Sequence, residues 1–402
     1  MDFPIPAGCL AVMERLTSRG YPVHLVGGCV RDLCRGVAPH DYDLTTSASP
    51  DEMKRAFAGL RVIETGIAHG TLTVLSDGRP YEVTTYRVDG RYSDGRHPDG
   101  VVFTASLEED LLRRDFTVNA MAYAPGTGLF DPFGGQDDLA ARLIRAVGDP
   151  DRRFSEDSLR ILRALRFSST LGFPIEEKTA AALIRLAPSV RRVSPERIRE
   201  ELLKMLSGTL SEEVLLSYRD VLFAAVPALV LIDGAWSEAA HAASRLSFDP
   251  ILALAALARP LGEAGTAALF RALRTDKKSE RRASSAVSAY DAILPADLSS
   301  AGLFLVDFGE TSARDAITLA GAYGDPLAGA ARKALDDFDA TGRPTSIAKL
   351  AVRGDDLSGI PAGPERKEAL AALLRLAATG EVANEREALL ARLRAEKRNQ
   401  NG

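Results

Sequence analysis

The chain has 402 residues, a length that favours two to four domains over one core. It is 46% hydrophobic and 26% charged, which is a globular composition, and its net charge of −5 argues weakly against nucleic acid as a partner. No apolar stretch reaches the roughly eighteen residues of a membrane span, and the N-terminus lacks a secretory signal. We therefore expect no membrane partner. Three cysteines give no disulfide framework, so we expect a protein of the reducing cytoplasm.

Residues 1–148 alternate short β-rich runs with helical patterns, which predicts one domain of mixed α and β structure round a single sheet. The expected strands are residues 24–26, 42–45, 70–75, 82–86 and 101–104. The expected helices are residues 8–18, 29–34 and 50–57. After residue 148 the chain is rich in Ala, Leu, Arg and Glu with helical periodicity, so an all-helical part follows.

Two glycines, Gly27 and Gly28, stand between the first expected strand and a helix. Glycine lets a backbone approach a phosphate closely, and the amides at a helix N-terminus favour anions. Arg31 lies in the first turn of that helix and could reach the same anion. A turn also needs glycine for its own geometry, so this pattern alone leaves a structural role open.

Asp41 and Asp43 flank Tyr42 where the second expected strand begins. Because strand side chains alternate, the two carboxylates should project to one face, where they repel each other unless a cation neutralises them. Such a pair suits Mg²⁺ with phosphate oxygens completing its shell, and a phosphate loop facing it indicates phosphoryl or nucleotidyl transfer. Glu82, in the strand at 82–86, is a candidate third carboxylate, as a metal ligand or a base, or an ordinary half-exposed strand residue.

Several motifs, in one order, resemble those of the class II tRNA nucleotidyltransferases, which comprise the bacterial and eukaryotic CCA-adding enzymes and their poly(A) polymerase relatives. The resemblance is strong over about the first 205 residues and rests beyond them on helical character alone. The motifs are Leu25–Arg35, Asp41-Tyr-Asp-Leu-Thr-Thr-Ser47, Glu82–Arg87, Asp94-Gly-Arg-His-Pro98, Arg113-Arg-Asp-Phe-Thr-Val-Asn-Ala-Met121, Asp131–Leu139, Val147–Pro150 and Arg153–Phe167.

The resemblance implies a polymerase-beta-like head in which Asp41 and Asp43 hold two Mg²⁺ ions. It implies that Arg114 and Asp115 organise the nucleotide through triphosphate or ribose contacts, and Asn119 could serve the ribose. Converging arginines suit a triphosphate because it is strongly negative. A polar segment that contains Asp94, Arg96 and Pro98 is expected to be the flexible loop that the family uses in switching from C to A addition.

Asp157 and Arg160 match the family's base-selecting pair, and their spacing on a helix predicts a shared face. Cytosine and adenine both offer an amino donor beside a ring-nitrogen acceptor, which a carboxylate and a guanidinium complement. Guanine and uracil present the reverse order, so the pair would reject them. The alternative is an ordinary intrahelical salt bridge. Arg163 and Arg166 follow in the same segment. They either touch phosphates or the acceptor stem, or they only form a solvated surface of the helix.

The sequence therefore predicts an α+β nucleotidyltransferase head at residues 1–148 and an all-α neck, body and tail at 149–207, 208–300 and 301–402. The body lacks the His-Asp doublet of a phosphohydrolase, and the tail is expected to bind the tRNA acceptor and T-arm. The expected activity is addition of C, C and A to the 3′ end of tRNA from CTP and ATP. The alternatives are a poly(A) polymerase or CC-only enzyme, and an idle RNA-binding scaffold.

Overall fold

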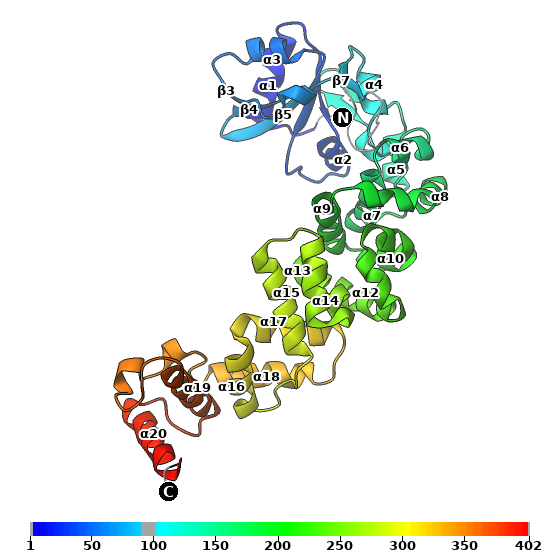
Figure 1. Cartoon of the computed structure of the whole chain (residues 1–402). Helices are drawn as coiled ribbons and strands as arrows, with labels where there is room; N and C mark the ends of the chain where they lie inside the picture. The colour runs from blue at the N-terminus through cyan, green and yellow to red at the C-terminus, as the bar shows by residue number, and fades with distance from the viewer. Residues whose placement is uncertain (1–2, 90–100, 401–402) are drawn as a thin grey trace. The chain divides into compact units, whose positions relative to one another are not determined.

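The computed structural model describes residues 3–89 and 101–400. The chain divides into two compact units, Met1–Pro227 and Ala228–Gly402. The first unit holds all the strands of the described residues, drawn in blue and cyan in Figure 1, and the second unit is helical. Within the described ranges no helix is both long and apolar enough to cross a membrane.

The first unit is built on a seven-stranded sheet in the order β3-β4-β5-β2-β1-β8-β9, beside a separate two-stranded sheet of β6 and β7. Only the β2–β5 pair of the large sheet is parallel. The strands are β1 (Val23–Val26), β2 (Asp43–Thr46), β3 (Arg61–Ile63), β4 (Thr71–Ser76), β5 (Arg79–Thr85), β6 (Arg87–Asp89), β7 (Val101–Phe103), β8 (Ala122–Ala124) and β9 (Gly128–Phe130).

The helices of the first unit cover the sheet and then continue the chain as a helical neck. They are α1 (Ala7–Thr17), α2 (Gly28–Cys34), α3 (Pro50–Ala56), α4 (Leu107–Leu112), α5 (Gly135–Ala140), α6 (Pro150–Glu156), α7 (Leu159–Leu171), α8 (Glu177–Leu186), α9 (Pro195–Leu206), α10 (Ser211–Ser217) and α11 (Arg219–Ala225). Short 3₁₀ turns are η1 (Ile67–His69), η2 (Thr117–Asn119) and η3 (Ala187–Arg192). The five strands and three helices predicted for the head are confirmed, with ends shifted by up to three residues.

Local sequence explains where these elements start and stop. Ser49 caps α3 through a reciprocal capping box with Glu52, and Pro50 occupies the first turn, where its missing N–H costs nothing. Gly172 ends α7 in the left-handed conformation with φ of 69°. The apolar side of α7 packs against α9, which fixes the helices that line the site described below.

The second unit consists of helices that bury Ala- and Leu-rich faces against one another, as the periodicity predicts. They are α12 (Trp236–Ser244), α13 (Pro250–Ala258), α14 (Gly262–Ala272), α15 (Lys277–Tyr290), α16 (Leu298–Phe308), α17 (Glu310–Ala322), α18 (Ala328–Asp339), α19 (Pro364–Thr379) and α20 (Arg386–Gln400). Four 3₁₀ segments join them: η4 (Pro227–Ala235), η5 (Arg259–Leu261), η6 (Ile347–Lys349) and η7 (Gly354–Asp356).

An ion triad joins three helical segments of the second unit. Arg282 of α15 donates to Asp249, the N-cap of α13, at 2.6 Å and to both oxygens of Asp315 on α17 at 2.7 and 3.0 Å. The two carboxylates raise the pKa of Arg282 because they bond to its charged form. The arrangement fixes the crossing of α13, α15 and α17 through one guanidinium.

Replacing Arg282 with alanine should therefore lower the free energy of unfolding of the second unit by about 2 kcal/mol. The loss arises because two largely buried carboxylates keep their charge without the cation that compensates it. Chemical denaturation followed by far-UV circular dichroism measures the change. Lys278→Ala is the matched control, since Lys278 lies on the same helix with an exposed side chain. An equal, small effect of both variants would show that the triad does not stabilise this unit.

Candidate active site

A cavity of about 350 Å³ lies in the first unit where the sheet meets the neck helices. The residues that line it come from the β1–α2 turn, the start of β2, the segment after α4, the α6–α7 junction, α7 and α9. Six arginines and three aspartates stand in the lining, so basic groups outnumber acidic ones. The lining residues are Gly27, Gly28, Arg31, Asp43, Arg113, Arg114, Asp115, Asn119, Asp157, Leu159, Arg160, Arg163, Phe167 and Arg197.

The β1–α2 turn brings bare backbone to the cavity wall. Gly27 has φ of 76° and ψ of −135°, a conformation that side-chain-bearing residues rarely adopt. A Cβ at this position would also lie 3.0 Å from Nη1 of Arg114. The glycine therefore meets both a backbone requirement and a space requirement, and it places the turn and the Arg114 guanidinium side by side at the cavity.

The carboxylate cluster is assembled by strand pairing. Asp43 is the first residue of β2, and in the parallel β2–β5 pair its register partner is Glu82. Partners in register project to the same face, so the adjacent-strand position expected for Glu82 is confirmed. Asp41 lies before the strand, and its side chain, 79% exposed, pairs with His40 at 3.0 Å. The strand begins at Asp43, one residue later than expected, so the strand alternation invoked for the two aspartates does not set the direction of the Asp41 side chain.

The electrostatics of Asp43 suit a cation. Desolvation of its carboxyl raises the pKa of Asp43, and the negative charges of Glu82 and Asp41 add to the increase, while Arg114 opposes it. Among the described residues no group of three His, Cys, Asp or Glu side chains is arranged as a closed metal site. Asp43 and its register partner Glu82 offer carboxylate oxygens, the donor type that hard divalent cations prefer.

Two arginines stand at the glycine turn. Nη2 of Arg114 donates to Asp110 at 3.3 Å, while its Nε is buried and has no hydrogen-bond partner within the described part of the chain. Arg31 donates through Nε and Nη2 to both oxygens of Asp32, at 2.9 and 3.0 Å, and through Nη1 to Asn119 at 2.8 Å. The charge of Arg31 is thus compensated by Asp32 and that of Arg114 by Asp110.

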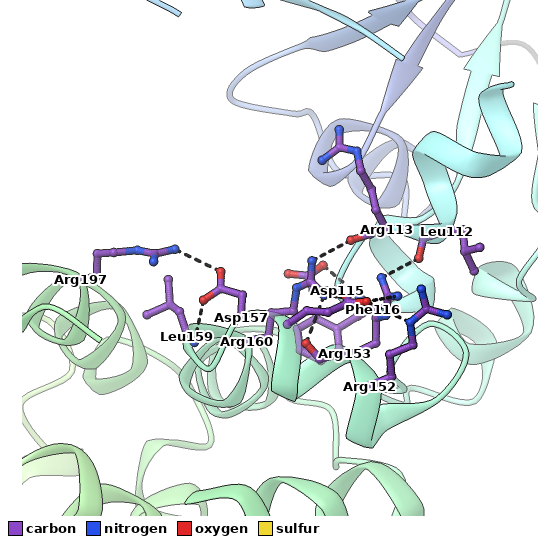
Figure 2. A network of polar contacts seen from close by, with 11 residues as sticks. Leu112, Arg113, Asp115, Phe116, Arg152, Arg153, Asp157, Leu159, Arg160 and Arg197 are labelled. Carbon is purple, nitrogen blue, oxygen red and sulfur yellow. Dashed lines mark hydrogen bonds and ion pairs between the residues drawn. The ribbon is translucent and has the colours of Figure 1, made fainter. Parts of the chain in front are cut away.

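Asp115 and Asn119 both line the cavity, and Figure 2 shows Asp115 among its neighbours. Asp115 is 7% exposed, and Arg163 of α7 donates to its Oδ2 at 2.5 and 2.7 Å. Burial alone would raise the pKa of Asp115, but the charges of Arg163 and Arg160 and the hydrogen bonds from Arg163 and Asn119 lower it. Asn119 donates to the other oxygen of Asp115 at 3.3 Å, so the sequence-predicted Asp115, Asn119 and Arg163 are brought together.

Asp157 is not on a helix with Arg160, contrary to the sequence prediction. It ends α6 with φ of −138° and ψ of 105°, and α7 begins two residues later. Its Oδ1 accepts from the backbone N–H of Leu159 at 3.0 Å, so the side chain caps the new helix. Its Oδ2 accepts from Arg197 of α9 at 3.2 Å (Figure 2).

Arg160 is fixed by contacts on several sides. It is 7% exposed, and Nη1 donates to Glu156 at 2.9 Å and to the carbonyl of Arg153 at 3.1 Å. Nη2 donates to the carbonyl of Arg113 at 2.8 Å (Figure 2). Asp157 and Arg160 therefore line the same cavity, each held by its own contacts, although a helix junction and not one helix face brings them there.

Some predicted residues lie outside this cavity or outside the described residues, and two residues were missed. Arg166 donates to Glu201 at 2.5 Å and stacks 3.9 Å from the Phe167 ring centre, outside the lining of this cavity. The predicted loop residues Asp94, Arg96 and Pro98 fall outside the described residues. Sequence reasoning missed Arg197 and Asp110. An N-cap signal, Asp157-Ser158 before an apolar run, was available for the helix break.

Comparisons with known proteins place this geometry among its relatives. A model of the poly A polymerase head domain matches residues 23–145, and one of the probable RNA and SrmB-binding site of polymerase A matches residues 172–221. The chain is 38% identical to the CCA-adding enzyme of Geobacillus kaustophilus over 95% of each protein. It is 39% identical to that of Geobacillus thermodenitrificans over 97% of each.

Solved structures agree with the curated relatives. The CCA-adding enzyme of Bacillus stearothermophilus, determined in complex with CTP, is similar at 32% identity and a TM-score of 0.78 across 98% of both chains. A CCA-adding enzyme in an apo form has the same fold at 22% identity and a TM-score of 0.72. The predicted fold class, a polymerase head followed by helical domains, is confirmed.

Proposed function

Because this chain belongs to the family of CCA-adding enzymes, which are tRNA nucleotidyltransferases, we propose that it adds C, C and A in turn to the 3′ end of tRNA without a template. CTP and ATP are the substrates. The observation that carries the proposal is the fixed pair of Asp157 and Arg160 on the wall of one arginine-rich cavity. A cavity of about 350 Å³ suits one small-molecule ligand at a time.

The base is read by the fixed pair. Asp157 accepts from Leu159 and Arg197, one contact per oxygen, and each carboxylate oxygen has capacity for a further donor. The exocyclic amine of cytosine or adenine would donate to Asp157, and the ring nitrogen would accept from the Arg160 guanidinium. The surrounding contacts hold both groups in place. Uracil and guanine would therefore put a carbonyl against the Asp157 carboxylate and a ring N–H against the Arg160 guanidinium, and they would bind more weakly.

The triphosphate is held by other residues of the same lining, Arg114 and the Gly27–Gly28 turn. Arg114 contributes a buried Nε without a partner in the described structure, and the Gly27–Gly28 backbone allows close approach. The excess of arginines over aspartates supplies the positive potential that a strongly negative triphosphate needs. Asn119 and Asp115, held by Arg31 and Arg163, stand where they can position the ribose.

In the reaction the 3′-hydroxyl of the RNA attacks the α-phosphorus, a new P–O bond forms, and the bond to pyrophosphate breaks. Asp43 and Asp41 would hold two Mg²⁺ ions, with Glu82 beside Asp43 as a further carboxylate. When bound, the cations supply activation of the hydroxyl and neutralisation of the leaving pyrophosphate. The residues of the chain hold the nucleotide in line and select its base.

The tRNA would reach this cavity with its acceptor end, and the helices after residue 148 would bind its acceptor and T-arm through backbone contacts. The match of residues 172–221 to an RNA-binding region supports this part of the proposal. The three cysteines are free thiols, which supports the cytoplasm as the place of action. A poly(A) polymerase or a CC-only enzyme of the same family is the rival, and an idle RNA-binding scaffold is the rival from another class.

Incorporation onto tRNA transcripts that end before CCA, after C and after CC tests the proposal. Each transcript receives MgCl₂ and CTP, ATP, GTP or UTP, singly or as CTP with ATP, and products are resolved at one-nucleotide length. We expect synthesis to stop after C, C and A, with no use of GTP or UTP. Long A tracts, also on an unrelated RNA hairpin, would contradict it in favour of a poly(A) polymerase, and a stop after CC would indicate a CC-only enzyme. No product with any nucleotide would favour the scaffold.

A further inference from the structure

A carboxylate behind the cavity is completely buried and yet ionised. Asp110 of α4 is 0% exposed. Burial by itself would raise the pKa of Asp110, but the charges of Arg113 and Arg114 and their hydrogen bonds lower it. A carboxylate in this environment is stable only while both guanidiniums stay beside it, because an unpaired buried charge is costly.

Both oxygens of Asp110 are occupied. Oδ1 accepts from Nε and Nη2 of Arg113 at 3.0 and 2.7 Å and from the backbone N–H of Arg87 at 3.3 Å. Oδ2 accepts from Nη2 of Arg114 at 3.3 Å, and it shares the single hydroxyl hydrogen of Thr45, at 3.3 Å, with the carbonyl of Thr84, at 3.1 Å. Thr45 lies on β2, two residues after Asp43, so Asp110 links the arginines to the strand that begins with that carboxylate.

The two arginines extend from Asp110 to the cavity. Both line it, and Arg114 lies against the Gly27 turn with its Nε unpartnered among the described atoms. The main-chain carbonyl of Arg113 accepts from Arg160, the guanidinium assigned to the base (Figure 2). Asp110 therefore holds a segment, Arg113 and Arg114, that is linked both to the groups assigned to the triphosphate and to the guanidinium assigned to the base.

We infer that Asp110 is a positioning residue: it fixes Arg113 and Arg114 for the triphosphate and ties them to β2. This inference rests on the proposed function, because it assigns the cavity to a nucleoside triphosphate. Asp110 itself does not line the cavity, so it acts through the arginines and not by contact with the substrate.

The test measures binding and not turnover. Calorimetric titration of the full-length protein with pyrophosphate and with CTP, each in MgCl₂, should give dissociation constants about tenfold higher for Asp110→Asn, as expected when a charge-assisted hydrogen bond no longer holds a binding arginine. Glu109→Gln is the matched control, since it removes the same charge from an exposed neighbour on the same helix. The affinity for tRNA should not change in either variant.

A double-mutant cycle separates positioning from general stability. In an Arg114→Ala background, Asp110→Asn should weaken pyrophosphate binding clearly less than the roughly tenfold expected in the wild-type background, because one of the two arginines that Asp110 holds is gone and only Arg113 remains. An undiminished effect in that background, or wild-type affinities in the single variant, would overturn the inference. If Asp110→Asn does not fold, Thr45→Val decides: weakening by about two- to threefold supports the role, and unchanged binding overturns it.

The binding assay also distinguishes this inference from the proposed function. A wild-type protein that binds pyrophosphate and CTP but extends no tRNA would refute the proposed activity. The dissociation constants of the Asp110 variants would still test whether Asp110 positions the arginines. A wild-type protein that binds neither ligand would overturn the inference on Asp110 as well.

Discussion

Replacing Asp43 with asparagine should lower the rate of CMP incorporation by about 10³-fold, the effect of losing several kcal/mol of metal-based stabilisation. Asparagine keeps the shape of the side chain but removes the charge that a hard cation requires. Single-turnover incorporation onto tRNA ending before CCA, at saturating MgCl₂, measures the loss. Asp51→Asn is the matched control, because Asp51 is an exposed aspartate of the same unit that lies on α3, outside the cavity lining.

The same variant should remain folded. The folded-state pKa of Asp43 is raised, so its ionised form costs stability above that pKa and its neutral form does not. Without Mg²⁺, Asp43→Asn should therefore unfold at the wild-type temperature or slightly above it. Thermal unfolding with and without MgCl₂ checks this, and Mg²⁺ should stabilise the wild type more than the variant. Incorporation at more than about a tenth of the wild-type rate would refute the assignment of Asp43 to the metal.

Asp157→Asn should lower the preference for CTP over UTP, expressed as the ratio of kcat/KM values, by roughly 10²-fold. The Leu159 N–H needs an acceptor, so the amide oxygen should stay at the Oδ1 position and the amide nitrogen should replace Oδ2. A donor then faces the base and Arg197, where an acceptor stood in the wild type. That donor repels the amine of cytosine and adenine and accommodates the carbonyl of uracil.

Steady-state incorporation of each of the four nucleotides onto tRNA ending before CCA measures the change in preference. Asp151→Asn is the matched control, because it removes an exposed carboxylate from α6 that pairs with Arg185 and does not line the cavity. An unchanged CTP-to-UTP ratio in an active Asp157→Asn enzyme would show that another group reads the base.

Short-range patterns predicted much of the fold and part of the site. The Gly27–Gly28 turn, the helix after it and the strand of Asp43 follow from residues within one turn or strand of each other, where backbone preferences decide. Glu82 beside Asp43 was one of two open readings, because the sequence does not fix which strands of a sheet are neighbours, and the pairing of β5 with β2 brings the two residues into register. The missed strands β3, β6, β8 and β9 have three residues each, and Ala122-Tyr-Ala124 carries no β-rich alternation.

The rest of the site depends on contacts that local patterns do not encode. Arg197 reaches Asp157 from a helix forty residues away, and Asp110 gathers Thr45 and Arg87 from two different strands. At Asp157 the sequence offers two competing signals, a carboxylate that can cap a helix and a helical pattern that runs through it. Helical periodicity on both sides favoured continuity, whereas the side-chain bond to the Leu159 N–H stabilises the break.

The most direct test of the central claim, that one cavity reads both cytosine and adenine, is a pair of crystal structures of the protein with CTP and with ATP. Both bases should lie against Asp157 and Arg160, with the amine within hydrogen-bond distance of the carboxylate and the ring nitrogen facing the guanidinium. Both triphosphates should contact Arg114 beside the Gly27 turn. A base bound away from Asp157 and Arg160, or CTP and ATP in two separate sites, would contradict the account.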